Sequence, residues 1–356
     1  MVNTRILPVS VDQPDSATIQ LAAEVLRAGG LVAFPTETVY GLGANALDAD
    51  AVNSIFAAKE RPASDPIIVH IDQVSDLAMV ATDVPLLAFE LASRFWPGPL
   101  TLVLRRSERV PPVVSAGMAT VAVRMPAHPI ARALIRQAGV PVAAPSANRF
   151  ARPSSTTAAH VLEDLDGRVD VILDGGPATI GLESTVLDLT RATPTVLRPG
   201  AVTLEMLRVV IPDVQILTRY LEVDQEGIEA PGMLLKHYSP RAELRLYAGE
   251  IQQVIPAMRQ NARDLAAAGR RVGLLIPDSE QGDFSDLPVE LRLLGGDLET
   301  ISHHLFDRMR ALDRDGVDVI LMHGLEQSGL GLALWDRLVR AANGQVIWCT
   351  ASDSQG

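Results

Sequence analysis

Residues 17–43, ATIQLAAEVLRAGGLVAFPTETVYGLG, decide the fold class of this chain. Ala17–Ala28 has the apolar spacing of an amphipathic helix, and Gly29-Gly30 ends it. Leu31–Phe34 is continuously apolar and predicts a buried strand. A run of hydroxyl side chains and glycines, Pro35–Gly43, follows this strand directly. A helix, a buried strand and a polar strand end in succession are typical of an α/β domain.

The same alternation continues through the first two hundred residues. Further helices are predicted at Asp48–Lys59, Leu86–Phe95 and His128–Gln137, and further strands at Ile67–Ile71, Leu100–Leu104, Thr120–Arg124, Val140–Ala144, Val169–Leu173, Ser184–Leu189 and Thr195–Leu197. We therefore expect residues 1–211 to form an α/β domain with helices packed on a twisted mixed sheet.

A change in composition after Ile211 predicts a second domain. Residues 212–241 contain an acidic stretch and the breaker Pro231-Gly232, and they are interpreted as a linker. From residue 242 to 356, strands and helices alternate again. The predicted strands are Leu244–Tyr247, Arg271–Ile276, Val317–Met322 and Val346–Cys349, and the predicted helices are Ile251–Ala268, Leu298–Asp313 and Leu332–Ala342. This pattern predicts a smaller α/β domain that is Rossmann-like in architecture only.

Composition and charge narrow the classes of function. The chain has 356 residues, of which 47% are hydrophobic and 21% charged, as in globular proteins. Its formal charge of −12 disfavours binding of nucleic acid across a broad surface. Basic residues nevertheless outnumber acidic ones between Lys59 and Arg152, and a local cationic site suits a small polyanion. With no apolar leader, no membrane span and one cysteine, Cys349, we expect a cytoplasmic protein without a cysteine zinc site or internal disulfide.

The familiar nucleotide-binding signatures do not fit. There is no Walker A sequence, and Gly41–Ala46 matches the G-x-G-x-x-A pattern without opening from the end of the preceding strand. The spacing therefore argues against NAD binding. His303-His304 are adjacent and lack metal-ligand spacing, so we expect solvated surface residues.

Several predicted strands end in polar segments. Besides Pro35–Gly43, these are Ala144–Asn148, Gly181–Thr185 and Leu197–Gly200, and the helix ending at Lys59 carries a second cation at Arg61. Each segment by itself is explained by a turn or by a cation at a helix C-terminus. Together they predict a ligand site, because α/β proteins bind ligands at strand ends.

The segments Phe34–Gly43, Lys59–His70, Pro145–Asn148 and Ser184–Gly200 resemble the YrdC-domain threonylcarbamoyl-AMP synthases. The Lys59-x-Arg61 and Ser146-x-Asn148 pairs are similar to the signature tetrad of that family, and His237-Tyr-Ser-Pro240 resembles the linker motif of its long, two-domain form. The sequence departs from the family at Ser64-Asp65, where the second residue is usually asparagine.

The resemblance implies an enzyme that joins ATP, L-threonine and bicarbonate into threonylcarbamoyl-AMP, with pyrophosphate release, for the threonylcarbamoyladenosine modification of tRNA next to the anticodon. Downstream tRNA-modifying proteins would accept the adenylate, direct tRNA contact would be weak, and no membrane is involved. Lys59 and Arg61 would be catalytic. Threonine would be bound by Thr38, His70, Arg124, Ala144 and Ser184, and ATP by Arg61, Asp65, Thr120, Ser146, Asn148, Ser154, Arg198 and Tyr238. No protein metal site is expected, since Mg²⁺ would be carried mainly by the ATP phosphates. Met233–Pro240 would close over the cleft as a lid.

Two alternatives remain open from the residues alone. One is an RNA-binding module that uses the arginines between Arg94 and Arg152, against which the overall acidity counts. The other is a carbamoyl-transfer enzyme of the kind found in hydrogenase maturation, whose cysteine-rich zinc fingers are missing from a chain with one cysteine.

Overall fold

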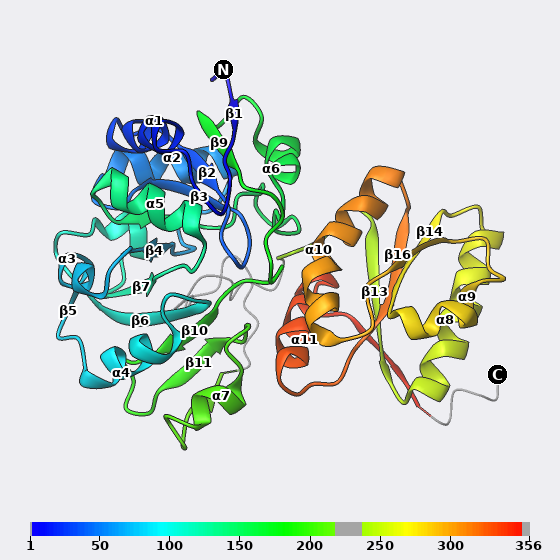
Figure 1. The fold of residues 1–356 in the computed structure, drawn as a ribbon. Helices are drawn as coiled ribbons and strands as arrows, with labels where there is room; N and C mark the ends of the chain where they lie inside the picture. The colour runs from blue at the N-terminus through cyan, green and yellow to red at the C-terminus, as the bar shows by residue number, and fades with distance from the viewer. Residues whose placement is uncertain (1, 218–236, 351–356) are drawn as a thin grey trace. The chain divides into compact units, whose positions relative to one another are not determined.

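The chain folds as two compact units (Figure 1). The structure is a computed structural model that describes residues 2–217 and 237–350. One unit comprises Met1–Phe150 and Ser154–Leu234, and the other comprises Ala151–Pro153 and Leu235–Gly356.

The first unit is built on one mixed sheet, which has twelve strands within the described residues. The strands are β1 Arg5–Pro8, β2 Val32–Phe34, β3 Gly41–Asn45, β4 Ile68–His70, β5 Ala81–Thr82, β6 Leu100–Arg106, β7 Thr120–Arg124, β8 Val142–Ala143, β9 Val171–Asp174, β10 Thr185–Asp188, β11 Thr195–Arg198 and β12 Gln215–Ile216. Their order is β1-β9-β2-β3-β8-β4-β7-β6-β10-β11-β12, with β5 beside β6. Parallel and antiparallel pairs both occur, which confirms the predicted mixed sheet.

Helices flank this sheet. They are α1 Ser16–Arg27, α2 Ala49–Lys59, α3 Leu77–Val80, α4 Leu86–Phe95, α5 Pro129–Ala138, α6 Ala158–Leu165 and α7 Leu204–Arg208, with short 3₁₀ turns at Val74–Asp76 and Pro112–Ser115. The Asp15 carboxylate accepts a hydrogen bond from the Thr18 amide and so caps α1. Gly29, with a φ of 83°, follows its end as predicted.

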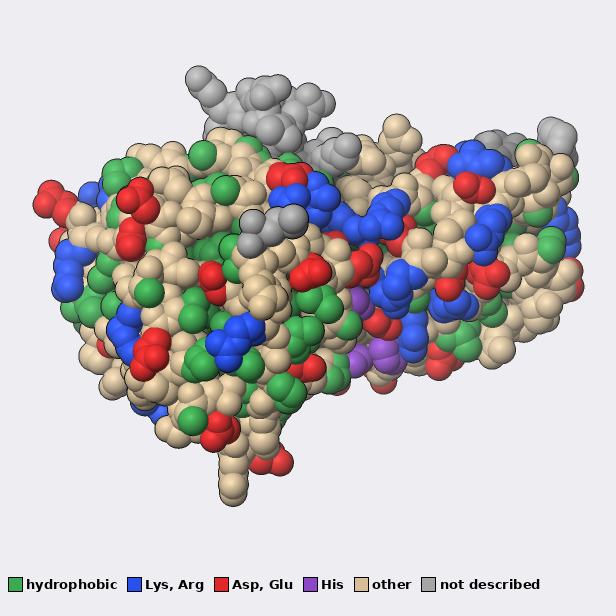
Figure 2. Space-filling model, turned by 90° about the horizontal axis from the view of Figure 1, so that it is seen from above, with side chains coloured by type: hydrophobic (Ala, Val, Ile, Leu, Met, Phe, Trp, Pro, Cys, Tyr) green, Lys and Arg blue, Asp and Glu red, His purple; other side chains and the backbone are tan. Residues whose placement is uncertain are grey.

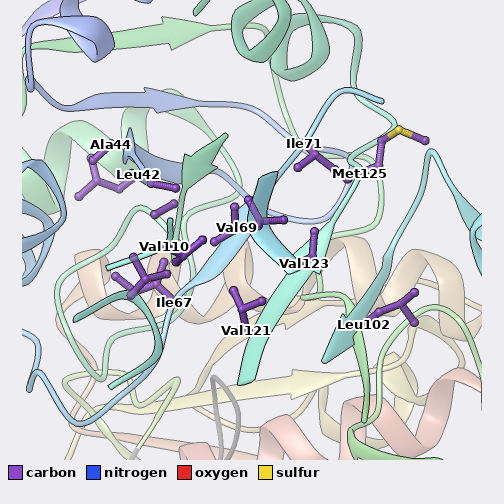
Figure 3. Packing of buried hydrophobic residues seen from close by; sticks show 14 of the residues in the cluster. Leu42, Ala44, Ile67, Val69, Ile71, Leu102, Val110, Val121, Val123 and Met125 are labelled. Carbon is purple, nitrogen blue, oxygen red and sulfur yellow. The ribbon is translucent and has the colours of Figure 1, made fainter. Parts of the chain in front are cut away.

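The two faces of the sheet have separate apolar cores. Leu26 of α1 and Leu134 of α5 pack with Phe34 on one face. On the other face, α2, α4 and α6 cover a larger core that includes Val69, Val123 and other strand residues (Figure 3). Successive strand side chains point to opposite faces. The residues next to the large-core residues along each strand therefore point to the face on which α1 and α5 pack.

Three differences from the sequence prediction concern short elements. Gly41–Asn45, expected as part of a turn, is strand β3 and pairs antiparallel with β2. Glycine is uncommon in strands, so the two glycines of β3 gave no strand signal in the sequence. The strand forms through its close contact with β2. The two residues of β12 lie inside the predicted linker but pair with β11, so the first sheet extends past residue 212. Helix α6 was missing from the prediction, although its Thr157 side chain caps it.

The second unit has a five-stranded sheet in its described residues, with the order β15-β14-β16-β13-β17 and only parallel pairs. The strands are β13 Glu243–Gly249, β14 Val272–Ile276, β15 Glu290–Leu293, β16 Val319–His323 and β17 Val346–Cys349; the helices are α8 Ile251–Ala267, α9 Gln281–Phe284, α10 Leu298–Asp315 and α11 Leu330–Ala341. The predicted Rossmann-like architecture is confirmed, and β15 is an addition whose four residues carry two charges. Across residues 2–217 and 237–350, no helix combines the length and the apolar character that crossing a membrane requires.

Candidate active site

One face of the first sheet carries several of the predicted site residues. In β7, Val121 and Val123 belong to the large core, so Thr120 and Arg124 point to the other face. The same alternation places Thr101 of β6 on that face. Because β6 and β7 pair with Thr101 opposite Arg124, these two side chains are cross-strand neighbours.

The floor of this face is apolar. Ile68, Val103, Ala122 and Val186 come from four adjacent strands and form a small buried cluster, against which Phe150 packs. An apolar floor bordered by a few oriented polar groups is the usual composition of a small-molecule site.

Arg124 is held in place on all sides. Its Nη1 donates to Thr38 Oγ1 at 2.8 Å, its Nε donates to the Gly98 carbonyl at 3.2 Å, and its Nη2 lies 2.6 Å from the Glu37 carboxylate. The side chain is 4% exposed. The structure thus joins the predicted threonine residues Thr38 and Arg124, and adds Glu37, which the sequence prediction did not include.

His70 lies opposite Arg124 in the pairing of β4 with β7. Burial, together with the positive charge of Arg124, lowers the pKa of His70 to about 3, so the ring is neutral at physiological pH. The Phe34 ring packs against it in a T-shaped arrangement, with 6.2 Å between the ring centroids and an interplanar angle of 88°. A Cβ at Gly43 would meet that Phe34 ring at 2.7 Å. The glycine pattern in β3 therefore serves packing beneath His70, and not a dinucleotide.

Ser184 and Arg198 form a second group beside Arg124. Arg198 Nε and Nη2 donate to the Ser184 carbonyl at 3.1 and 2.9 Å, and Nη2 also reaches Ser184 Oγ at 3.2 Å. Ser184 Oγ shares a hydrogen bond of 2.7 Å with Thr101 Oγ1. The hydrogen bonds thus link a predicted ATP residue, Arg198, with a predicted threonine residue, Ser184, and Thr101 is the cross-strand neighbour of Arg124.

The signature tetrad residues Lys59, Ser146 and Asn148 come together at the end of α2. The Lys59 ammonium donates to the backbone carbonyls of Ser146 and Asn148, and Lys59 is 1% exposed. Ala144, two residues earlier, donates its amide to the Ile68 carbonyl at 2.9 Å, so a backbone contact with threonine would run through its carbonyl oxygen.

The fourth tetrad residue, Arg61, pairs with Asp65. Nη2 of Arg61 lies 3.0 Å from the Asp65 carboxylate, and the guanidinium also donates to the carbonyls of Asp65 and Pro66 at 3.2 and 2.8 Å. Asp65 is fully buried. The acidic residue at this position is therefore neutralised by its own neighbour, which explains how a carboxylate is accommodated beside a predicted phosphate site.

Ser154 and Thr120 lie at other edges of the same region. Ser154 is fully buried, and its hydroxyl donates to the Glu183 carboxylate, one residue before Ser184. Thr120 begins β7, is half-buried and pairs with Arg105. Glu183 is a second acidic residue that the sequence prediction did not include.

Tyr238 belongs to the second unit. Its ring is fully buried, stacks on Phe306 with 5.4 Å between centroids, and lies 5.5 Å from the guanidinium carbon of Arg337. Its φ of 61° is rare for a residue with a side chain, so the His237–Pro240 motif forms a constrained turn. The predicted contact of Tyr238 with ATP stays a prediction. The rest of the predicted lid, up to residue 236, lies outside the described residues.

Acidic side chains accompany two of the predicted cations. Arg124 and Arg61 each contact a buried carboxylate, and Glu183 accepts from Ser154. These two arginines are thus paired with acids and held in fixed orientations. On the surface seen in Figure 2, basic and acidic side chains are interspersed, which disfavours the RNA-binding alternative for that face.

The residues that the prediction missed had weak signals. Glu37 and Glu183 stand inside quoted motifs, but the sequence alone gives no reason to expect a buried acid beside each predicted donor. Thr101 could have been found by counting alternate residues along β6. Among residues 2–217 and 237–350, no three histidine, cysteine, aspartate or glutamate side chains are grouped so that they could hold a metal ion.

Comparisons with known proteins identify the family of the chain. The family model described as "Telomere recombination" matches residues 24–200, and that of the "Threonylcarbamoyl-AMP synthase, C-terminal domain" matches residues 202–343. The chain is 47% identical to the threonylcarbamoyl-AMP synthase of Pyrococcus abyssi in an alignment of 329 residues. The alignment covers 92% of this chain and 95% of the relative. It is 44% identical to the Bacillus subtilis enzyme of the same name in an alignment of 333 residues, and this alignment covers 92% of this chain and 94% of the relative.

The fold comparison points the same way. A crystal structure of P. abyssi Sua5 complexed with L-threonine superposes with a TM-score of 0.92 at 45% identity, over 97% of this chain and all of that one. The chain therefore belongs to the threonylcarbamoyl-AMP synthase family of nucleotidyltransferases.

Proposed function

We propose that this chain synthesises threonylcarbamoyl-AMP from ATP, bicarbonate and L-threonine and releases pyrophosphate. One observation carries the proposal. Two hydrogen-bonded groups lie side by side on the sheet: Arg124 donates to Thr38, and Thr101, the cross-strand neighbour of Arg124, shares a hydrogen bond with Ser184, to which Arg198 also donates. An arginine suited to a carboxylate and a second arginine suited to a phosphate are thereby placed near each other.

The proposed reaction joins two anions. Bicarbonate supplies CO₂ with loss of hydroxide, and the threonine amine captures the CO₂ as a carbamate and loses a proton, so that water is released. A carbamate oxygen then attacks the α-phosphorus of ATP. The new oxygen–phosphorus bond replaces the bond between the α-phosphorus and the bridging oxygen, and pyrophosphate leaves with that bridging oxygen. Such a step depends on placement and on fixed positive charge more than on proton transfer.

Lys59 suits the nucleotide side of this reaction. Two backbone carbonyls fix its ammonium beside Ser146 and Asn148, so its charge needs no reorganisation when phosphate arrives. We assign Lys59 and Arg61 to the β- and γ-phosphates, where charge develops as pyrophosphate departs. Arg198, Ser146, Asn148, Ser154, Thr120 and Asp65 would border the nucleotide.

Arg124 suits the threonine carboxylate, because a guanidinium can bind a carboxylate through two hydrogen bonds. Glu37 on its far side keeps the guanidinium oriented and balances its charge before the substrate binds. His70, neutral because burial lowers its pKa to about 3, would offer a hydrogen bond without adding charge. Thr38, Ser184 and the Ala144 carbonyl would complete the pocket.

Mg²⁺ is proposed to enter with ATP. Its usual ligands are oxygen atoms of phosphates, water and one or two carboxylates. Of the buried carboxylates near the site, Glu37 and Asp65 are engaged by arginines and Glu183 by Ser154. This donor set fits an ion held chiefly by the phosphate oxygens, whose charge the ion would help to neutralise.

The product suggests the wider role. A threonylcarbamoyl adenylate is a group donor, and we propose that tRNA-modifying proteins of the cytoplasm transfer the group to the adenosine next to the anticodon. Any direct contact of this chain with tRNA would be weak, because the chain carries a net charge of −12.

The test is incubation of the full chain with ATP, Mg²⁺, bicarbonate and threonine, followed by rapid mass spectrometry of the nucleotides. We expect threonylcarbamoyl-AMP, no adenylate when threonine is omitted, little activity with valine and intermediate activity with serine. Equal nucleotide turnover with and without threonine would contradict the proposal. Tight, salt-sensitive tRNA binding without turnover would instead favour an RNA-binding module.

A further inference from the structure

Three residues of the proposed nucleotide loop belong structurally to the second unit. Asn148 and Ser154 lie in the first unit, whereas Ala151–Pro153, between them in the chain, pack with the second unit. The loop that carries two proposed ATP residues therefore contains a short segment that belongs to the second unit.

Helix α10 holds the end of this segment through a buried arginine. Arg310 is fully buried, and its Nε and Nη2 donate to the carbonyl of Pro153 at 3.2 and 2.6 Å. A buried guanidinium is costly unless hydrogen bonds compensate for its lost hydration. Two of its hydrogen bonds go to the Pro153 carbonyl, and they fix the peptide that leads directly into Ser154.

The other two residues of the segment are held as well. Nη2 of Arg152 lies 3.4 Å from the Asp313 carboxylate of α10, and the Ala151 carbonyl accepts from the Ser239 amide at 2.7 Å. The Asp313 carboxylate also accepts from the Arg241 amide, at 2.9 Å to each oxygen. Side-chain and backbone contacts therefore fix all three residues.

The same helix also holds the His237–Pro240 turn. Phe306, Arg310 and Asp313 follow one another at spacings of four and three residues, which places them on one side of α10. Phe306 stacks on Tyr238, while Arg310 and Asp313 hold the 151–153 segment. One helix side thus supports both the linker turn and the loop segment.

The flanks of the segment are anchored in the first unit. The Asn148 carbonyl accepts from the Lys59 ammonium, the Phe150 amide donates to the Lys59 carbonyl at 2.9 Å, and Ser154 donates to Glu183. Ser154 follows Pro153 directly in the chain, so a change in the Pro153 peptide alters the backbone that leads into Ser154.

We propose that Arg310 is a positioning residue for ATP: through Pro153, helix α10 of the second unit sets the conformation of the loop that presents Asn148 and Ser154. The second unit then contributes to nucleotide binding from within the loop, beyond any covering of the site. This inference rests on the proposed function, which assigns Asn148 and Ser154 to ATP. Arg124 and Thr38, which we assign to threonine, lie outside this loop and should be affected little.

The test compares Arg310→Ala, Arg310→Lys and the control Arg340→Ala in the full chain. Arg340 is a buried arginine of the same unit that contacts Asp336 on its own helix. We expect Arg310→Ala to raise the KM for ATP about tenfold or more, with a change in the KM for threonine of less than about twofold. Lysine, which restores a charged donor, should recover part of the loss. The control should leave the ratio of the two KM values near that of the wild type.

Hydrogen exchange of residues 149–156, which needs no turnover, separates this inference from the proposed function. Arg310→Ala should speed exchange there, and Arg340→Ala should not. Unchanged exchange, an unchanged KM for ATP, or equal losses for ATP and threonine would overturn the inference. If Arg310→Ala does not fold, Arg310→Lys decides: a smaller rise in the KM for ATP, without a matching rise for threonine, and faster exchange at residues 149–156 support the inference, and no change in either overturns it. Absence of threonine-dependent turnover in the wild type would contradict the proposed function alone, and calorimetric titration with ATP and Mg²⁺ would then replace the KM values.

Discussion

At the scale of residues, the site owes its organisation to acids placed behind its cations. Glu37 contacts Arg124 and Asp65 contacts Arg61, and both carboxylates are buried. A buried guanidinium without such a partner would be strongly destabilising, and a mobile one would lose the fixed orientation that anion binding exploits. The acids therefore stabilise the empty site at some cost in attraction for an anionic substrate.

Asp65→Asn tests this balance. Removing one negative charge next to Arg61 should lower the KM for ATP severalfold, since the phosphates then meet a less neutralised cation. The same change should cost about 1 to 3 kcal/mol of unfolding free energy, because the buried guanidinium loses its ionic partner. Steady-state kinetics and urea unfolding measure the two effects. An unchanged or higher KM for ATP would show that Asp65 does not set the charge of the phosphate site.

Arg124→Lys tests the threonine assignment. Lysine keeps the charge but cannot bind Thr38, Glu37 and the Gly98 carbonyl in one planar arrangement, nor a carboxylate through two bonds. We expect the KM for threonine to rise about 100-fold, with a much smaller effect on ATP. Arg105→Lys is the control, because Arg105 is exposed at the other end of neighbouring strand β6. Equal effects of the two variants would refute the assignment.

His70 allows a test by pH. Its pKa is about 3 in the folded protein and near its ordinary value of 6.5 in the unfolded chain, so the unfolded state binds the proton first on acidification. Stability should therefore fall as pH decreases through the window from 6.5 to 3, by about 1.4 kcal/mol per pH unit from this group. In His70→Gln, urea unfolding between pH 4.5 and 6.5 should show a slope reduced by that amount. An unaltered slope would contradict a buried neutral histidine.

At the scale of elements, the glycines of β3 leave room for the Phe34 ring, which packs against His70 of the site. Gly43→Ala would place a Cβ 2.7 Å from the Phe34 ring and 2.8 Å from Val142, so the variant should lose about 1 to 3 kcal/mol of stability. Because Phe34 contacts His70, the KM of the Gly43→Ala variant for threonine should rise too. Gly282→Ala in α9, where a Cβ would meet nothing within 4 Å, is the matched control. Thermal unfolding with equal midpoints for both variants would contradict this packing.

The longer elements and the signature residues could be predicted from the sequence. Helix α1 follows from its apolar spacing and its glycine stop, and strands β6 and β7 from their apolar runs. Strands β3 and β12 could not, since one is glycine-rich and the other has two residues, and both depend on pairing with distant segments. Likewise, motifs indicated Lys59, Arg124 and Arg198, whereas the acids beside them became evident only from three-dimensional contacts.

At the scale of the whole molecule, the two units differ in what they supply. The first presents a polar sheet face with an apolar floor, where the predicted threonine and ATP residues are linked by hydrogen bonds. The second holds Ala151–Pro153 and the His237–Pro240 turn on one side of α10. A chain that ends at Leu234, the last residue of the first unit, should therefore keep threonine binding better than ATP binding, which calorimetric titration with each substrate can measure. Equal retention of both affinities would contradict this division.

The central claim is that this one site makes the threonine carbamate attack ATP. Its most direct measurement is turnover in ¹³C-labelled bicarbonate, with unlabelled ATP and threonine, followed by mass spectrometry of the quenched nucleotides. The account predicts an adenylate that contains threonine and one ¹³C atom, formed together with one pyrophosphate, and lost in Lys59→Met. An adenylate of threonine without the label, or AMP and pyrophosphate released at the same rate without threonine, would contradict it.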